Sequence, residues 1–358
     1  MGMQREAPAE KDRNASPSIP MRYLVTGGLG YAGAWFTSAL AAAGHETFVL
    51  SRKTGVPALH ANPLPGRARP SDDALPYTLI QADLEKQGPE ELAALLPDGL
   101  DVVIHAASFN ESFAQDYGRR ALIVNALGTR NLLDALIVQN TNSARPLPLV
   151  LYISTVHVYG ASHGHITENS PLRPRNDYAL THLFGEEYCR MFMRVHNLPL
   201  IVIRLSNGYG APKTADSTKW YLLLHDLCRN AVSRGRIVLR SDPAIRRDFI
   251  WLGDAAAAVK ALSGRPDLSG GIFNLSSGAS LRLDEVARRV CAVASRFFRK
   301  DVPLVLEGEQ YSASEPSFLH VDNAAIRAAL NLCFHDRMEE EILALLSLPT
   351  AGQTVGLP

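Results

Sequence analysis

One stretch near the N-terminus decides the fold that the sequence predicts: Tyr23-Leu24-Val25-Thr26-Gly27-Gly28-Leu29-Gly30-Tyr31-Ala32-Gly33. A short apolar run is followed by three glycines at intervals of three and then by an apolar segment, residues 34–43. This order predicts a strand, a glycine turn and a helix. Gly27 permits the tight turn, Gly30 lets a diphosphate approach the backbone, and Gly33 lets the helix pack close to the strand. Because the start of such a helix offers free N–H groups to phosphates, the stretch predicts dinucleotide binding.

Four more strands are predicted downstream, at residues 46–50, 77–81, 101–105 and 147–153. Helical patterns at residues 122–138 and 178–195 alternate with them. This alternation is typical of right-handed βαβ units, so we expect an α/β fold with a doubly wound, Rossmann-type parallel sheet and a smaller α/β substrate-binding C-terminal domain. The expected boundaries are a disordered extension at 1–20, a cofactor domain at 21–205 plus about 235–262, a substrate domain at 206–234 and 263–349, and a tail at 350–358.

Composition excludes several classes of function. The 358 residues contain 36 Lys and Arg against 36 Asp and Glu, which gives no electrostatic case for binding nucleic acid or an anionic membrane. The four cysteines are far apart, which is typical of buried thiols in a reducing compartment. We find no secretory signal pattern and expect no apolar run long enough to cross a bilayer, so the predicted location is cytoplasmic.

No metal site is expected from the sequence. His163 and His165 lie in a loop rich in Gly and Ser, without a carboxylate at ligand spacing.

The end of the second strand bears on the choice of cofactor. An acidic residue there would accept hydrogen bonds from the adenosine ribose and repel a 2′-phosphate. This chain has Ser51 followed by Arg52 and Lys53, which favours NADP(H) over NAD(H). The alternatives are that Arg52 is a solvated loop charge or stacks on the adenine, and NAD(H) stays open.

Further motifs follow the glycine stretch in a fixed order: Asp83-Leu84, His105-Ala106-Ala107, Asn125-Ala126-Leu127-Gly128-Thr129, Ser154-Thr155, Tyr178, Arg204-Leu205-Ser206-Asn207-Gly208-Tyr209-Gly210, Arg247-Asp248-Phe249-Ile250 and Phe273-Asn274-Leu275. Over roughly residues 21–335 the chain therefore resembles the extended short-chain dehydrogenase/reductase family. The resemblance is closest to its NAD-dependent epimerase/dehydratase group, which acts on nucleotide sugars.

The resemblance implies roles for individual residues. Thr155 would hydrogen-bond the sugar oxygen, and Tyr178 would be its general acid/base. Ser108, Asn207 and Arg247 would bind substrate. A homodimer through a four-helix interface is also implied, the alternative being that these helices are wholly intramolecular core. The implied cofactor site comprises Gly27, Gly30, Tyr31, Ala32, Ser51, Arg52, Asp83, Leu84, Ala106, Ala107, Asn125, Ser154, Tyr178 and His182.

The chain departs from the family at the fourth residue after Tyr178, where the family has Lys and this chain has His182. A free tyrosine has a pKa of about 10, and a nearby ammonium lowers it. Histidine is shorter and only partly cationic near neutral pH. Tyr178 and His182 share a helix face at this spacing. His157 is a second catalytic candidate, the alternative being a structural histidine.

Two further features bear on the substrate and reaction. The segment around His157 offers no carboxylate, which argues against a 4,6-dehydratase. The family often has an Arg shortly before the aspartate matched to Asp322, and residues 310–317 contain none. Either Arg282 or Lys213 supplies that phosphate contact, or the substrate is an unusual sugar.

We therefore expect an NAD(P)-dependent enzyme that moves a hydride between nicotinamide and a sugar carbon, with an epimerase ranked slightly ahead of an NADPH-dependent ketosugar reductase. A dinucleotide-binding protein with weak or no catalysis is the alternative that the replacement of Lys by His182 leaves open.

Overall fold

The computed structural model describes residues 20–53, 59, 76–110, 114–141, 145–214, 219–307 and 318–348. The N-terminal extension up to residue 19 and the C-terminal tail lie outside the described residues.

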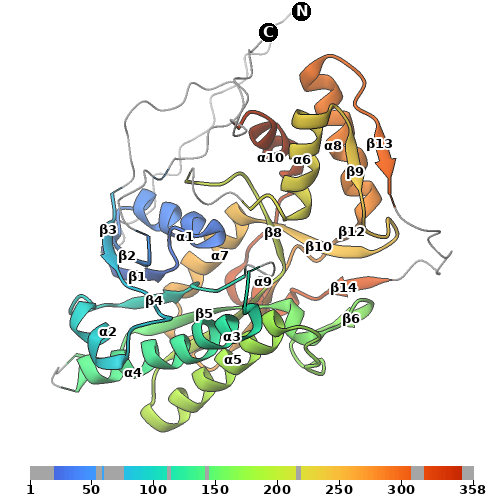
Figure 1. Cartoon of the computed structure of the whole chain (residues 1–358). Helices are drawn as coiled ribbons and strands as arrows, with labels where there is room; N and C mark the ends of the chain where they lie inside the picture. The colour runs from blue at the N-terminus through green and yellow to red at the C-terminus, as the bar shows by residue number, and fades with distance from the viewer. Residues whose placement is uncertain are drawn as a thin grey trace, which may run out of the picture.

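A parallel sheet of seven strands forms the centre of the molecule, in the order β11-β7-β5-β4-β1-β2-β3 (Figure 1). Its strands are β1 (Arg22–Thr26), β2 (Glu46–Ser51), β3 (Thr78–Gln81), β4 (Val102–His105), β5 (Leu149–Thr155), β7 (Leu200–Leu205) and β11 (Ile272–Leu275). From β1 the chain adds β2 and β3 on one side of that strand, and it then crosses over to form β4 on the other side of β1. The predicted Rossmann-type arrangement is confirmed, and its switch point lies between β1 and β4, where such sheets bind ligands.

Helices cover both faces of this sheet (Figure 1). One face carries α1 (Tyr31–Ala42) and α7 (Leu252–Ser263), and the other carries α2 (Pro89–Leu95), α4 (Gly128–Asn140) and α5 (Asp177–His196). Side chains of β1 alternate between the two layers, because Tyr23 and Val25 join one apolar core and Leu24 joins the other. A strand buried on both faces explains why the first apolar run shows no polar alternation.

The helix predicted at 122–138 begins earlier and is not uniform. It runs through α3 (Tyr117–Ala121), a π-helical segment η1 (Leu122–Leu127) and α4. Single π turns inside α-helices often occur at functional sites, and this one contains Asn125. Sequence periodicity did not predict the π turn, because it depends on tertiary contacts of Asn125.

The same helical segment tests the expectation that no apolar run is long enough to cross a membrane. Tyr117–Asn140 is long and apolar enough to cross a bilayer by length and composition, which corrects the expectation that no run reaches this length. Half of its most apolar window is buried inside the fold, as in core helices of many proteins, so it is weak evidence for a span.

A smaller unit packs beside the sheet (Figure 1). Its apolar core joins α6 (Leu223–Arg234), α8 (Leu283–Phe298) and α10 (Met338–Leu346) to the strand pair β9 (Ile237–Leu239) and β13 (Leu304–Leu306). Two small sheets connect it to the rest of the molecule. The first has the order β12-β10-β8, and the second pairs β14 with β6. The remaining elements are η2 (Val156–Tyr159), β6 (Gly164–Ile166), β8 (Asn207–Tyr209), β10 (Arg246–Trp251), η4 (Pro266–Leu268), β12 (Ser280–Arg282), β14 (Leu319–Val321) and α9 (Ala324–Leu330).

The structure divides the chain differently from the expected boundaries at two places. β9 was assigned to the cofactor domain, but it pairs with β13 and packs among α6 and α8. β11 was assigned to the substrate domain, but it is the edge strand of the large sheet, beside β7. The reason is that α7 crosses over the sheet and returns the chain to it, which adds one more parallel strand.

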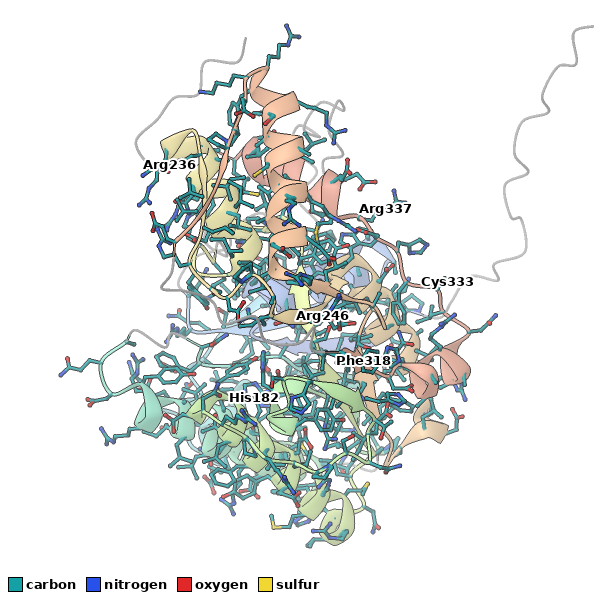
Figure 2. All side chains as sticks on the ribbon, turned by 90° about the vertical axis from the view of Figure 1, so that its right-hand side faces the viewer. His182, Arg236, Arg246, Phe318, Cys333 and Arg337 are labelled. Atoms are coloured by element: carbon teal, nitrogen blue, oxygen red, sulfur yellow. The ribbon has the colours of Figure 1, made fainter. Side chains whose placement is uncertain are left out.

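The cysteines also differ in part from expectation. Cys189 and Cys228 are buried as predicted, Cys291 is half-buried, and Cys333 is exposed (Figure 2).

Candidate active site

The glycine turn after β1 is shaped by contacts that exclude side chains. Gly27 has a φ of +67°, and a Cβ there would lie 2.7 Å from Cα of Ala107. A Cβ on Gly33 would lie 2.2 Å from the carbonyl oxygen of Gly27. Gly30 is the N-cap of α1 and brings no side-chain hydrogen bond, so the N–H groups of Tyr31 and Ala32 have no partner within the helix. The turn therefore fits the diphosphate of a dinucleotide.

A chain of hydrogen bonds lies directly beneath this turn. Oγ1 of Thr129 donates to the carbonyl oxygen of Asn125 at 2.7 Å, so Nε2 of His105 donates to Thr129 at 2.9 Å. Nδ1 of His105 then accepts from Thr26 at 2.6 Å. Burial lowers the pKa of His105 to about 3, assisted by His182, which keeps the ring neutral. The chain fixes the ends of β1 and β4, where Ala106 and Ala107 meet Gly27.

Asn125 connects this region to α5. Its side-chain amide accepts from the N–H of Phe109 at 2.7 Å and donates to Oγ1 of Thr181 at 3.0 Å. Asn125 therefore connects, by hydrogen bonds, the segment after β4 to the helix that carries Tyr178.

Thr155 and Tyr178 meet at the carboxyl end of β5. Thr155 is the last residue of that strand, and Tyr178 is the second residue of α5, whose N-cap Asn176 accepts from the N–H of Ala179 at 2.9 Å. Burial raises the pKa of Tyr178 to about 12, although its hydrogen bond with the Thr155 side chain lowers it. In the part of the chain that the structure describes, no cation contributes to this pKa. Tyr178 is therefore protonated at neutral pH.

His182 is buried with 3% of its surface exposed, inside the molecule (Figure 2). Its ring centroid lies 4.3 Å from that of Tyr178, and Nδ1 donates to the backbone carbonyl oxygen of Tyr178 at 2.7 Å. Because a carbonyl oxygen only accepts, the proton of the neutral ring is on Nδ1, and Nε2 carries a lone pair. Burial lowers the pKa of His182 to about 4, which outweighs the opposing effects of this hydrogen bond and of Glu186. His182 thus offers an acceptor at the position where the resemblance implies a lysine donor.

A buried ion pair that the sequence analysis missed lies one helical turn further along α5. Arg204 on β7 donates to both carboxylate oxygens of Glu186, at 3.0 and 2.7 Å, and Ser154 donates to the same carboxylate at 2.6 Å. The hydroxyl of Ser154, which the sequence analysis assigned to the cofactor site, therefore binds within the protein. The sequence did contain a signal for Glu186: Tyr178, His182 and Glu186 are spaced by four residues and therefore share one face of a helix.

His157 is a second histidine close to Tyr178. Its ring centroid is 6.0 Å from that of Tyr178, and the residue is exposed. Crowding by the surrounding protein and the positive charge of Arg247 lower the pKa of His157, so it is neutral at pH 7. His157 therefore lies beside Tyr178, and Arg247 is near enough to His157 to affect its pKa.

Among the described residues, no ion pair is found between Arg247 and an aspartate. The carboxylate of Asp248 accepts instead from the hydroxyls of Ser206 and Ser277 and from the N–H of Gly278. Burial lowers the pKa of Arg247, which is half-buried. Such a cation is placed to bind an anionic group of a substrate.

Two other predicted substrate residues differ in their surroundings. The side-chain amide of Asn207 donates to the carbonyl oxygen of Asp248 at 2.8 Å and so joins β8 to β10. Ser108 is exposed just after β4.

The predicted residues around the adenosine end are placed at the ends of β2 and β3. Oγ of Ser51 accepts from the N–H of Lys53 at 3.2 Å, and Arg52 is exposed. A carboxylate oxygen of Asp83 accepts a hydrogen bond from the N–H of Glu85 at 3.0 Å. This bond stabilises the turn that begins at Asp83. Leu84 is buried against Gly128 of α4, so it acts in packing.

Both residues considered as substitutes for the missing arginine have other contacts. Arg282 pairs with Asp284 at 3.0 Å. Lys213 is buried, and its Nζ lies 4.0 Å from the ring centroid of Trp35. Burial lowers the pKa of Lys213 to about 8. The segment 310–317 lies outside the described residues.

Lys213 belongs to a contact between α1 and the smaller unit. There Tyr31, a predicted cofactor residue, donates its hydroxyl to the carbonyl oxygen of Gly210 at 2.8 Å.

The sequence analysis expected no metal site because no carboxylate lies at ligand spacing from His165 in the sequence, but in the fold one lies beside it. His165 was thought to have no carboxylate nearby, but Asp322, far away in the sequence, lies 2.8 Å from its Nε2.

Comparison with known proteins agrees with the motifs. The model of the NAD dependent epimerase/dehydratase family matches residues 23–276. A protein described as an uncharacterized UDP-glucose epimerase from Bacillus subtilis is 24% identical, covering 72% of this chain and 78% of its own length. GDP-6-deoxy-D-mannose reductase from Pseudomonas aeruginosa is 27% identical, with 77% and 81% covered. The fold is similar to that of RMD from Pseudomonas aeruginosa complexed with NADPH, with a TM-score of 0.70, 24% identity, and 91% and 98% of the two chains covered.

Proposed function

Because the chain belongs to the NAD dependent epimerase/dehydratase family, whose members are NAD(P)-dependent epimerases, dehydratases and reductases, we propose that it reduces a keto group on a nucleotide sugar. The observation that carries this proposal is the placement of Thr155 beside the Tyr178 phenol at the carboxyl end of β5. It lies on the same edge of the sheet as the glycine turn, which would hold the cofactor through Gly27, Gly30 and the first-turn N–H groups of α1. When bound, the nicotinamide supplies the hydride.

The protein's own part in this reaction is the transfer of one proton. Reduction turns a keto oxygen into a hydroxyl, so a proton donor must stand beside that oxygen. Tyr178 is such a donor, because its pKa of about 12 keeps the phenol protonated at neutral pH. Thr155 hydrogen-bonds the phenol and, next to it, would bind the same substrate oxygen. His182 would accept a hydrogen bond at Nε2 without supplying charge.

The same features determine the direction that we favour. Oxidation of a sugar hydroxyl requires Tyr178 to act as a base, and its phenolate is scarce without a cation nearby. This changes the ranking expected from the sequence, where an epimerase came first. An epimerase is the second candidate, because His157 is neutral, partly exposed and 6.0 Å from Tyr178, and so is able to accept a proton.

The pH dependence of reduction follows from these assignments. Tyr178 must keep its proton, and its pKa is about 12, while His182 is neutral above its pKa of about 4. Steady-state kcat for ketosugar reduction is therefore expected to be flat between roughly pH 6 and 10. A rate that rises with pH toward a midpoint near 7 would instead indicate a phenolate base and the epimerase reaction.

The variant His182→Lys extends this test. An ammonium beside Tyr178 should lower the phenol pKa by at least about one unit and move the falling limb of the profile to lower pH. His182→Gln is the matched control, since a neutral side chain should leave the limb in place.

Arg247 is proposed to bind the substrate's phosphate. Losing a charge-assisted hydrogen bond of about 1.5–3 kcal/mol should raise KM for the nucleotide sugar about 10- to 100-fold in Arg247→Met, with little change in kcat. The control is Arg246→Met, because the neighbouring guanidinium donates to the carbonyl oxygen of Ser280 at 3.1 Å. Equal effects of the two substitutions on KM would contradict this role.

NADP(H) is the proposed cofactor. β2 ends at Ser51 rather than at an acidic residue, and Arg52 is exposed beside it. The opposing feature is Glu85, whose pKa is lowered chiefly by Arg120 and in part by Arg52.

A homodimer is also proposed. Apolar side chains remain exposed on η1 and α5, which pack against each other: Leu122, Leu127, Leu180 and Phe184. This surface would bury against its copy.

The function is tested by following NADPH and NADH oxidation with a panel of nucleoside-diphosphate ketohexoses. We expect turnover with NADPH. Absence of turnover with every sugar, together with no thermal stabilisation by any nicotinamide nucleotide, would overturn the enzymatic proposal.

A further inference from the structure

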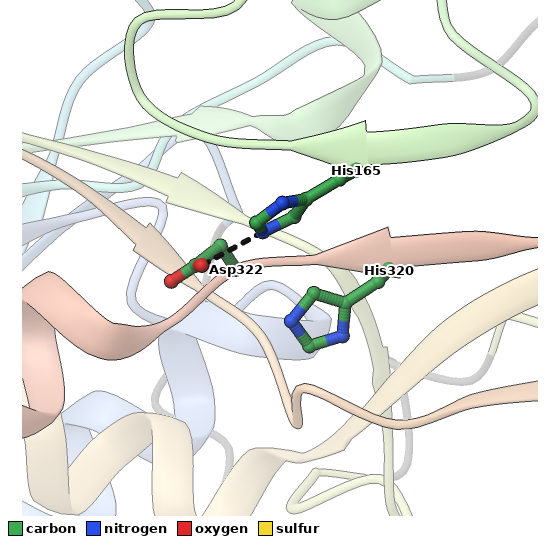
Figure 3. A group of neighbouring side chains, drawn as sticks. All are labelled: His165, His320 and Asp322. Atoms are coloured by element: carbon green, nitrogen blue, oxygen red, sulfur yellow. Dashed lines mark hydrogen bonds and ion pairs between the residues drawn. The ribbon is translucent and has the colours of Figure 1, made fainter.

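We propose that His165, His320 and Asp322 bind a divalent transition metal ion, with Zn²⁺ as the reference, at a site apart from the one proposed for hydride transfer. Their ligand atoms all lie within 4.8 Å of one another (Figure 3). The proposal does not depend on the reaction that the chain catalyses.

Backbone pairing places the three side chains together. β6 and β14 are parallel, and His165 is directly opposite His320 in their register. Asp322 follows His320 by two residues, so both side chains leave the strand on the same side. The N–H of Asp322 donates to the carbonyl oxygen of Ile166 at 2.8 Å, which continues the pairing through this residue. The cluster is thus fixed by main-chain geometry.

The carboxylate of Asp322 is already oriented. One oxygen accepts from the N–H of Ala324 at 2.7 Å, and the other lies 2.8 Å from Nε2 of His165. The hydrogen bond from Ala324 and the contact with His165 lower the pKa of Asp322, with a smaller effect of His320. Among the described residues, no Lys or Arg contributes to this shift. The Asp322 carboxylate gives the cluster a negatively charged oxygen donor, which favours a cation.

The donor set suits zinc. Two imidazole nitrogens and one carboxylate oxygen, with a water in the fourth position, are a common tetrahedral set. Metal–ligand distances of about 2.0–2.1 Å require donors about 3.3 Å apart, so the cluster must contract. His165 can rotate to allow this, since 54% of its side-chain surface is exposed. Binding would replace the hydrogen bond between His165 and Asp322.

A metal here would join two distant parts of the chain. β6 follows the turn η2 that carries His157, and β14 follows residues 308–317 of the C-terminal region. The β6–β14 contact has three paired positions, so it is short. A bound ion would stabilise the pairing of β6 with β14 by linking side chains from both strands.

The test is calorimetric titration of Zn²⁺ into the tag-free, chelator-treated full chain. We expect one ion per chain. Loss of an outer-shell partner weakens metal sites 10- to 100-fold, so His320→Ala and Asp322→Asn, which remove a direct ligand, should each weaken binding at least about tenfold. His163→Ala is the matched control and should bind as the wild type does, because His163 is in the same loop but outside the cluster.

Two further measurements keep the result interpretable. Thermal unfolding in chelator should give the variants the Tm of the wild type, and added Zn²⁺ should raise Tm in the wild type and in His163→Ala alone. Absence of binding to the wild type would overturn the proposal. Binding that survives both ligand substitutions but is lost in Cys333→Ser, the exposed thiol, would also overturn it.

Discussion

Tyr178→Phe is expected to lower kcat/KM for ketosugar reduction by about a thousandfold, within the range of general acid catalysis. The substitution removes only the phenolic oxygen, so the half-buried ring still fills its place beside Thr155 and His182. Cofactor affinity, measured by fluorescence titration with NADPH, should stay within about threefold, because the contribution of the hydroxyl is realised in the transition state. Stopped-flow measurement of NADPH oxidation in a single turnover separates the chemical step from product release.

Tyr188→Phe is the matched control for this substitution. Tyr188 lies on the same helix, half-buried, and packs against the apolar core of α2 and α4. It should retain the wild-type rate. A Tyr178→Phe enzyme with more than about a tenth of the wild-type kcat/KM would show that another group delivers the proton.

Arg204→Met is expected to lower the free energy of unfolding by about 3–5 kcal/mol. Arg204 is 1% exposed and Glu186 is fully buried, and the pair joins β7 to α5. Burial alone would lower the pKa of Arg204, but the bond with Glu186 outweighs it and raises the pKa. Removing the guanidinium leaves a buried carboxylate whose remaining partners among the described residues are Ser154 and a more distant Arg190. Urea unfolding at pH 7, followed by circular dichroism, measures the change.

Glu187→Gln provides the comparison within the same helix. Glu187 pairs with Arg190 at the surface, and exposed pairs contribute about 0–1 kcal/mol. The double variant Arg204→Met with Glu186→Leu should recover part of the loss, because it removes both charges from the interior. A loss below about 1 kcal/mol for Arg204→Met would mean that water or another group solvates Glu186.

Much of the fold was predictable from local pattern. The glycine spacing and the alternation of strands and helices indicated the doubly wound parallel sheet. The positions of β9 and β11 were not predictable, because a short apolar strand carries no information about which sheet it joins. The π turn at Asn125 was missed for a related reason, since its side chain bonds Phe109 and Thr181 across the fold.

The candidate site was likewise predicted in part from the sequence. Helical spacing placed Tyr178 beside His182, and the family motif placed Thr155 next to them. Spacing did not indicate that His182 is neutral, because that depends on burial and on the tautomer set by the Tyr178 carbonyl. The cluster around His165 was also missed, since its partners lie more than 150 residues away at His320 and Asp322.

The most direct test of the account is the fate of deuterium carried at both hydrogen positions of C4 of NADPH. The enzyme would be incubated with the labelled cofactor and a nucleoside-diphosphate 4-ketohexose, and the sugar product analysed by mass spectrometry. Reduction with Tyr178 as proton donor predicts one deuterium in each product sugar and one NADP⁺ formed for each. Unreduced ketosugar with the NADPH unchanged would contradict the account. Conversion of the corresponding 4-hydroxy sugar into its C4 epimer with no deuterium incorporated would also contradict it, and would indicate an epimerase that returns the substrate's own hydride.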